Sequence, residues 1–166
     1  MSTPERDGEL LVVDSEVPVP ALAPAIWDFL TRSDGRGMRD IIQGSDGLEK
    51  ENADITEVGY RFTEFFTDPD TEDRVPCTWR TVMKSPSHWH LVAEDFLYRG
   101  LTIHLDYSVS GRSDDVHLRR RMRTWVPAGT ELTTGWWTRL GDQKLADQVA
   151  RKIAAGVAEQ PGRNVG

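Results

Sequence analysis

Apolar and polar residues alternate along the middle of the chain in the way that β-strands require. The clearest case runs from Leu101 to Val109, where apolar or aromatic residues occupy every odd position and polar residues lie between them. A period of two places the apolar side chains on one face of a strand. Comparable patterns predict further strands over 10–17, 58–66, 75–83, 88–97 and 116–126. Together these segments favour a large antiparallel sheet with one buried face.

Helical patterns accompany the predicted sheet. Residues 21–30, which follow two prolines, are expected to form a short helix, and 38–42 a second one between glycine-containing turns. From about 134 to 159, apolar residues recur at every fourth position, which predicts one long amphipathic helix. Gly141 lies inside that segment, so we expect a kink there. A long helix after a large sheet would cover its concave face and leave a ligand-binding chamber.

This order of elements resembles the helix-grip fold of the START/Bet v 1-like (SRPBCC) superfamily, and within it the polyketide cyclase/dehydrase and lipid-transport branch. Val17 to Thr31 is similar to the opening of that branch, Leu101 to Trp125 to its final hairpin, and Trp136 to Val157 to its last helix. The resemblance implies an α+β fold in which a curved seven-stranded antiparallel sheet wraps around a long C-terminal helix, with two short helices after the first strand. No catalytic signature carries over residue by residue, and fold does not fix function.

The length and net charge of the chain limit the classes of function that it can have. The 166 residues suit one START/Bet v 1-like ligand-binding domain over 9–160, with flexible ends at 1–8 and 161–166. A net charge of −7 argues against a nucleic-acid partner. No apolar run approaches the roughly 20 residues that membrane insertion requires. The polar N-terminus and the single cysteine, Cys77, favour a cytoplasmic, reducing location and an inert buried thiol.

Three residues break the apolar faces of the predicted strands and are the candidate catalytic groups. Glu64 and Arg120 place charges on inward faces, and Tyr107 places a phenol there. Buried charges are costly unless they are paired or serve a ligand. The two charged side chains could pair with each other across the chamber. Alternatively, Arg120 stabilises an enolate-like oxygen, and Glu64 acts as a general acid or base with a pKa raised by burial. A one-residue slip in strand phase would turn these side chains outward.

The predicted chamber wall is rich in aromatic residues, and the chain has six tryptophans. Flat aromatic walls suit planar ligands, which stack on them. Trp136 and Trp137 begin the closing helix, where one of them could gate the chamber. The strand over 88–97 has a weaker alternation; its more apolar face would bring Asp95 inward. The predicted ligand-binding residues are Tyr60, Phe62, Trp79, Thr81, Trp89, Asp95, Leu105, Met122, Trp136, Trp137 and Leu140, with Met83 as a further wall residue.

Two polar groups are assigned to the outer face of the sheet. His88 and His90 could hold zinc with His104 or Asp106, but their positions favour a solvated surface, and no metal is predicted. Three arginines share one strand face and are expected to be balanced by acidic neighbours; docking of an acidic acyl carrier protein is the alternative. These are Arg119, Arg121 and Arg123.

Two functions from different classes fit the predicted chamber. The first is a cofactor-independent, cyclase-like enzyme of secondary metabolism, such as antibiotic biosynthesis, acting on a hydrophobic polyketide-type intermediate. The second is a non-catalytic protein that binds, carries or sequesters a hydrophobic small molecule, as self-resistance proteins do. A third reading, a chaperone-associated interaction domain, predicts instead a filled interior and an exposed apolar patch.

Overall fold

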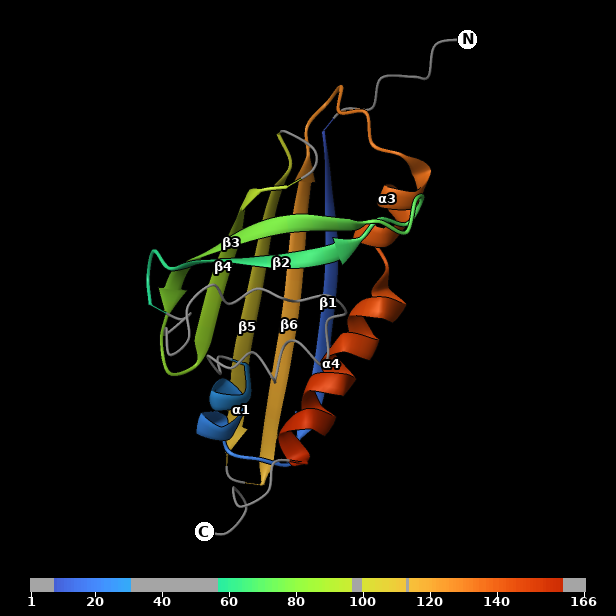
Figure 1. Ribbon diagram of the computed structural model, residues 1–166. Helices are drawn as coiled ribbons and strands as arrows, with labels where there is room; N and C mark the ends of the chain where they lie inside the picture. Colours follow the sequence, from blue (N-terminus) through green and yellow to red (C-terminus); the bar gives the residue numbers. More distant parts are fainter. Residues whose placement is uncertain (1–7, 31–56, 97–99, 113, 160–166) are drawn as a thin grey trace.

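Six strands form one antiparallel sheet in the computed structural model, which describes residues 8–30, 57–96, 100–112 and 114–159, apart from the side chains of Glu94 and Asp95 (Figure 1). The strands lie in the order β1-β6-β5-β4-β3-β2, so β1 and β2 are the two edges. Their bounds are β1 Glu9–Val19, β2 Arg61–Thr67, β3 Arg74–Lys84, β4 His88–Asp95, β5 Thr102–Arg112 and β6 Asp115–Val126.

The alternation of the sequence sets the faces of these strands. In β5 and β6, every second side chain is buried, and the register pairs Leu105 with Met122 and Tyr107 with Arg120. A slip of one residue would expose the whole apolar set, so burial of one face holds this register. In β4, Trp89 and Leu91 are buried, as the weaker alternation there predicts.

The number of strands, the start of β2 and the side that Met83 faces differ from the prediction. The described residues form six strands rather than seven, because only six segments alternate and the seventh came from the family resemblance alone. Val58 is 64% exposed, since β2 begins only at Arg61. Met83, predicted as a wall residue, is 43% exposed because an irregularity in pairing between Thr81 and Met83 reverses its side.

The closing segment forms two helices instead of the single long helix predicted. Helix α3 covers Thr134–Leu140 and helix α4 covers Gln143–Ala158. At the break, the N–H of Gly141 closes α3 on the carbonyl of Trp137, and the Asp142 carboxylate accepts the N–H of Leu145 to begin α4. An aspartate at an N-cap starts a new helix readily. The expected kink at Gly141 is therefore a complete helix end.

Helices α1 (Ala23–Leu30) and α4 lie on the same side of the sheet, and α4 packs along β1 (Figure 1). The buried stripe of α4 consists of Ala146, Ala150, Ile153 and Val157. Trp136 and Leu140 of α3 join Val75 in a smaller, separate apolar cluster. The second short helix, predicted over 38–42, lies outside the described residues. None of the helices in the described part of the chain is long and apolar enough to cross a membrane.

Candidate functional site

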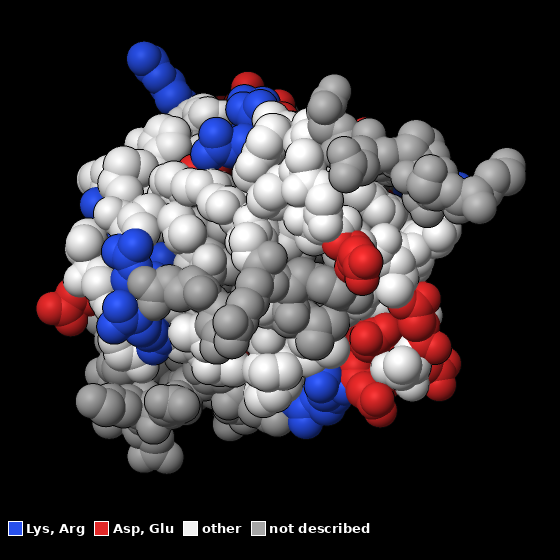
Figure 2. Space-filling view, turned by 90° about the horizontal axis from the view of Figure 1, so that it is seen from above, with Lys and Arg blue, Asp and Glu red and all other residues white. Residues whose placement is uncertain are grey.

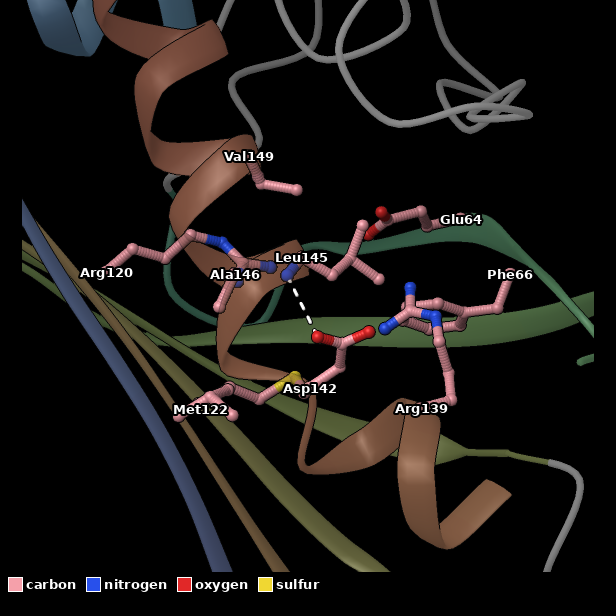
Figure 3. A pocket seen from close by; sticks show the side chains of 10 residues that line it. Glu64, Phe66, Arg120, Met122, Arg139, Asp142, Leu145, Ala146 and Val149 are labelled. Atoms are coloured by element: carbon pink, nitrogen blue, oxygen red, sulfur yellow. Dashed lines mark hydrogen bonds between the residues drawn. The ribbon is translucent and has the colours of Figure 1, made fainter. Parts of the chain in front are cut away.

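A small pocket that contains charged side chains lies where α3 and α4 meet the sheet (Figure 3). The space that the centre of a water molecule can occupy is about 30 Å³, which is room for about two waters. The pocket therefore has the size of a chemical group and is far smaller than the chamber expected for a polycyclic ligand. Its lining comprises Val13, Glu64, Phe66, Arg120, Met122, Arg139, Asp142, Leu145, Ala146 and Val149.

Three separate elements each contribute a charged side chain to this pocket. Glu64 comes from β2, Arg120 from β6 and Arg139 from α3, and all three are directed towards its centre (Figure 3). Glu64 is 3% exposed and Arg120 is 9% exposed. The alternation of their strands forces both side chains inward, as predicted, and the end of α3 brings the third charge to meet them.

Glu64 is the group most perturbed by this environment. Burial raises its pKa from 4.5 to about 7, while the charge of Arg120, the indole N–H of Trp79 and the charge of Arg139 act to lower it. The Trp79 indole faces the carboxyl without forming a hydrogen bond of normal geometry. Near neutral pH the carboxyl is therefore divided between its acid and its base form, which is the state that general acid–base chemistry needs.

Arg120 is held from behind by Tyr107. The Arg120 Nε donates to the Tyr107 hydroxyl at 3.3 Å, and its guanidinium carbon lies 5.8 Å from the centre of the tyrosine ring. Tyr107 in turn stacks on Trp89 with ring centres 5.6 Å apart. Burial raises the pKa of Tyr107, so the phenol stays neutral. Tyr107 thus positions Arg120, and it is not among the residues that line the pocket.

The charges share the pocket without forming direct ion pairs. Within the described residues, no carboxylate oxygen lies within 4.0 Å of a guanidinium nitrogen of Arg120 or Arg139. Arg139 lies over the ring of Phe66, with its guanidinium carbon 5.4 Å from the ring centre. Burial and the neighbouring Arg120 lower the pKa of Arg139. Glu64 and Arg120 therefore interact through space, and the contact that would make them a structural ion pair is missing.

The other predicted ligand-binding residues lie mostly in the apolar core around the pocket. Of the full predicted set, Glu64, Arg120 and Met122 line the pocket, and the side chain of Asp95 is outside the described residues. Trp137 and Tyr60 are half-buried, and Trp136 and Leu140 belong to the smaller cluster under α3. The remaining residues are buried core: Phe62, Trp79, Thr81, Trp89 and Leu105.

Two polar lining residues, Arg139 and Asp142, were not predicted. Both lie off the apolar stripe of the continuous helix that the sequence suggested. The helix end at Gly141 changes the direction of the chain and turns both side chains towards the sheet. One local signal was available: an aspartate three residues before Leu145 is typical of an N-cap, which would have divided the segment into two helices.

The outer face of the sheet carries the histidines and the arginine stripe. His90 Nε2 and His104 Nδ1 lie 2.8 Å apart, yet the part of the chain that the structure describes contains no group of ligands able to hold a metal ion. Arg119 and Arg123 are paired with Asp14 and Asp106. This face is therefore a surface of largely balanced charges, as predicted.

Comparison with known proteins identifies the fold of this chain but does not assign the chain to a protein family. No family model matches the chain, and no curated protein matches it. An uncharacterised protein from Rhizobium leguminosarum has a similar structure, with a TM-score of 0.65 at 8% identity over 95% of this chain and 100% of that one. The KanY protein gives 0.61 at 12% identity over 90% and 99%. Norcoclaurine synthase from Thalictrum flavum gives 0.59 at 13% identity over 93% and 90%. These likenesses support a Bet v 1-like fold.

Proposed function

We propose that this protein binds a small organic molecule with an enolisable carbonyl group and catalyses proton transfer on it without a cofactor, as in a cyclase-type condensation. One observation carries the proposal: Glu64, Arg120 and Arg139 converge on one pocket from three elements and make no direct ion pairs there. Charges that stabilised only the fold would be expected to contact each other, because uncompensated buried charges are costly.

The geometry suits a simple sequence of proton transfers. The ionised form of Glu64 removes a proton from the carbon next to the carbonyl, and the electron pair of that C–H bond moves to the carbonyl oxygen as an enolate. Arg120, already held by Tyr107, stabilises the negative oxygen. Protonation of the same carbon by Glu64 reverses the step. Alternatively, the enolate carbon attacks a second carbonyl and closes a ring, and the alkoxide formed there takes the proton from Glu64.

The size of the pocket and one structural neighbour favour a small substrate. The structure of norcoclaurine synthase contains dopamine and hydroxybenzaldehyde, which are single-ring aromatic molecules. A single carbonyl head group matches the small space beside Glu64 better than a whole polycyclic body does. A more specific version of this proposal is that the substrate is a polyketide-type intermediate. Such a molecule would place only its reacting end in this pocket.

A non-catalytic binding or carrier protein is the alternative, and the state of Glu64 favours the catalytic function. A carrier needs no group that changes protonation near neutral pH, whereas burial gives this carboxyl a pKa of about 7. The interaction-domain alternative has its own support: Leu10, Val12 and Trp125 on the outer face are 55%, 40% and 43% exposed. An interaction domain, however, would not explain the charged side chains that are buried in the pocket.

The test is hydrogen exchange at carbon. Phenylacetone and 4-phenyl-2-butanone are incubated with the protein in D₂O, and loss of their α-hydrogen signals is followed by NMR. We expect exchange faster than with an equal concentration of acetate, and a loss of at least tenfold in Glu64→Gln and in Arg120→Met. Full activity in both variants would exclude these residues as catalytic groups, and the absence of exchange with either ketone would favour the carrier.

A further inference from the structure

We infer that this pocket also binds a carboxylate, held through its single negative charge between Arg120 and Arg139. The inference rests on the proposed function because it concerns the same pocket: the carboxylate takes the position of the enolate oxygen on Arg120 while Glu64 is in its acid form, so it competes with the ketone substrate.

Arg120 provides the first half of this anion site. It is 9% exposed, and its Nε is satisfied by the Tyr107 hydroxyl. Its remaining guanidinium nitrogens have no hydrogen-bond partner among the described residues and face the pocket (Figure 3). These nitrogens are not among the fully buried atoms that lack a partner, so they stay open to the pocket and can donate to an acceptor that enters it. A carboxylate can accept two parallel bonds from one guanidinium.

Arg139 provides the second half from the opposite wall. Its guanidinium rests on the Phe66 ring and makes no ion pair or hydrogen bond within the described part of the chain. Burial, and after it the like charge of Arg120, lower the pKa of Arg139. An anion between the two guanidiniums would replace their mutual repulsion by two attractions, whereas a cation or a neutral molecule would leave the repulsion in place.

The charges of the lining select a monoanion. Arg120 and Arg139 are positive, Asp142 is negative, and Glu64 can be neutral near pH 7. With Glu64 protonated, the lining carries one net positive charge, which a carboxylate neutralises. A phosphate dianion would leave one uncompensated negative charge in a mostly buried site, which is unfavourable.

The other residues that line the pocket indicate the chemistry of the rest of the ligand. Val13, Met122, Leu145 and Val149 are apolar and surround the charged groups. Leu145 and Val149 come from α4 and are only half-buried, so they can contact a ligand that enters from the helix side. The matching molecule has one carboxylate attached to an apolar body.

The binding of an anion here should be linked to proton uptake by Glu64. In the described part of the chain, the charged and polar groups near this carboxyl include Arg120 from β6, Arg139 from α3, Trp79 from β3, Tyr107 from β5 and Asp142 between the two helices. A bound carboxylate adds a negative charge beside Glu64 and favours its protonated form. Affinity should therefore be highest below pH 7 and fall by up to about tenfold per pH unit above it.

The experiment uses matched pairs of small probes on the full chain. Benzoate and 2-naphthoate are compared with benzamide and 2-naphthamide by NMR of the tryptophan indole N–H signals, at pH 6 and pH 8. We expect at least one carboxylate to bind, its neutral amide to bind on the order of tenfold or more weakly, and phenyl phosphate to bind more weakly than benzoate.

Variants separate the pocket from general charge effects. Arg139→Gln should weaken carboxylate binding on the order of tenfold or more, while Arg121→Gln, an exposed arginine on the outer side of β6, changes net charge equally and should leave affinity unchanged. Arg120→Gln removes the deeper contact of the carboxylate, but it also disturbs Tyr107. If Arg120→Gln does not fold, the affinity of Arg139→Gln decides whether the inference holds. Glu64→Gln should make binding independent of pH and tighter than in the unmodified protein at pH 8.

Four results would overturn the inference: no binding of either carboxylate at 20 mM, equal binding of the amides, tighter binding of phenyl phosphate than of benzoate, or equal losses in Arg139→Gln and Arg121→Gln. The outcome is distinguishable from that of the proposed function. Arginine-dependent carboxylate binding without α-hydrogen exchange would support the anion site and refute catalysis. Exchange without carboxylate binding would refute the anion site alone.

Discussion

The most informative residues of this protein are charged side chains at positions where the strand pattern calls for apolar ones. Glu64 and Arg120 lie on inward faces, and each is nearly inaccessible to solvent. Moving such groups out of water costs several kcal/mol unless other groups compensate. Here the compensation is spread over Tyr107, Trp79 and the long-range attraction between the charges, so the pKa of Glu64 reports directly on its neighbours.

Arg120→Met should raise the pKa of Glu64 above its present value of about 7, because it removes the nearest positive charge while keeping an apolar side chain of similar length. The measurement is a ¹³C NMR titration of the Glu64 carboxyl. Arg121→Met, which removes a charge from the outer face of the same strand, is the control and should leave this pKa almost unchanged. A lower Glu64 pKa in Arg120→Met would show that the two side chains do not interact as described.

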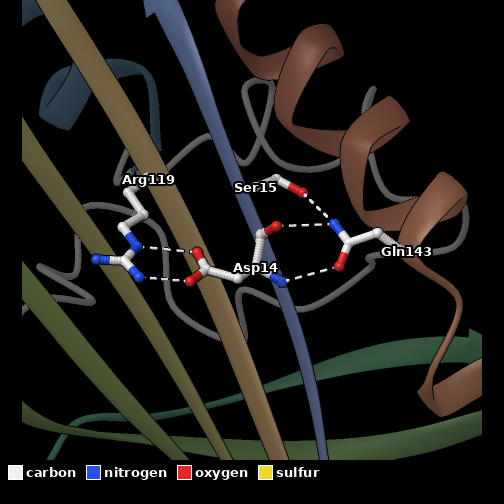
Figure 4. Close-up of polar contacts among 4 residues, drawn as sticks. All are labelled: Asp14, Ser15, Arg119 and Gln143. Carbon is white, nitrogen blue, oxygen red and sulfur yellow. Dashed lines mark hydrogen bonds and ion pairs between the residues drawn. The ribbon is translucent and has the colours of Figure 1, made fainter.

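At the scale of elements, α4 protects an exposed edge of the sheet (Figure 4). The Gln143 side-chain amide accepts the backbone N–H of Asp14 at 3.2 Å and donates to its carbonyl at 2.8 Å, as a neighbouring strand would. Ser15 adds a 2.6 Å bond to Asp147 on the same helix. Open strand edges invite pairing with other chains, so this contact both docks α4 and blocks the edge.

Gln143→Ala should lower the free energy of unfolding by about 1–2 kcal/mol, because it removes four side-chain hydrogen bonds, two of them to the Asp14 backbone, which is left to water. Amide exchange at Asp14 should become faster. Gln148→Ala, on the exposed side of the same helix, is the matched control and should change stability by no more than about 0.5 kcal/mol. Equal effects of the two substitutions would mean that the edge contact contributes little.

Close packing of α4 against α1 depends on a residue without a side chain. A Cβ at Gly156 would overlap the ring of Phe29, which is buried in α1. Gly156→Ala should therefore destabilise the protein by about 1–3 kcal/mol in chemical denaturation, although alanine is the better helix former. Phe29→Leu combined with Gly156→Ala should recover part of that loss relative to the sum of the single changes. A more stable single Gly156→Ala variant would contradict the close contact.

At the scale of the whole molecule, charge is distributed unevenly around the end that carries α3. Figure 2, viewed from that end, shows acidic side chains gathered on one side of the surface. The β2–β3 turn contributes to this group, and its Asp70 accepts a 2.6 Å hydrogen bond from Thr133, the N-cap of α3. The acidic turn therefore helps to hold α3, and with it Arg139, over the pocket.

Stability should fall as pH rises from 4.5 to 7 because of Glu64. The folded protein keeps this carboxyl protonated up to about pH 7, whereas the unfolded chain loses the proton near 4.5, so the stabilisation is complete below 4.5 and lost above 7. The difference corresponds to about 3 kcal/mol.

The measurement is urea denaturation from pH 4.5 to 8 of the unmodified protein and of Glu64→Gln. Subtracting the two curves is necessary because His104, whose pKa is lowered, adds stability as pH rises towards 6.5 and opposes the trend. Relative to the unmodified protein, the variant should gain about 3 kcal/mol between pH 4.5 and 8. A difference that does not change with pH would show that Glu64 titrates normally in the folded state.

The sequence by itself determined the parts of this structure that depend on local geometry. The period of two assigned the inward faces of the strands, and so placed Glu64, Tyr107 and Arg120 in the interior. The same pattern located the six strands to within a few residues. These features follow from the alternation of side chains along an extended backbone, which needs no knowledge of distant neighbours.

Only the tertiary structure decided which of these residues meet. The helix end at Gly141 turned Arg139 and Asp142 into the pocket, which a continuous helical stripe could not indicate. Several aromatic residues predicted to line a chamber contact one another, as Trp89 does Phe62 and Tyr107. Packing fills space according to the relative placement of whole elements, and that placement depends on contacts between residues far apart in the chain.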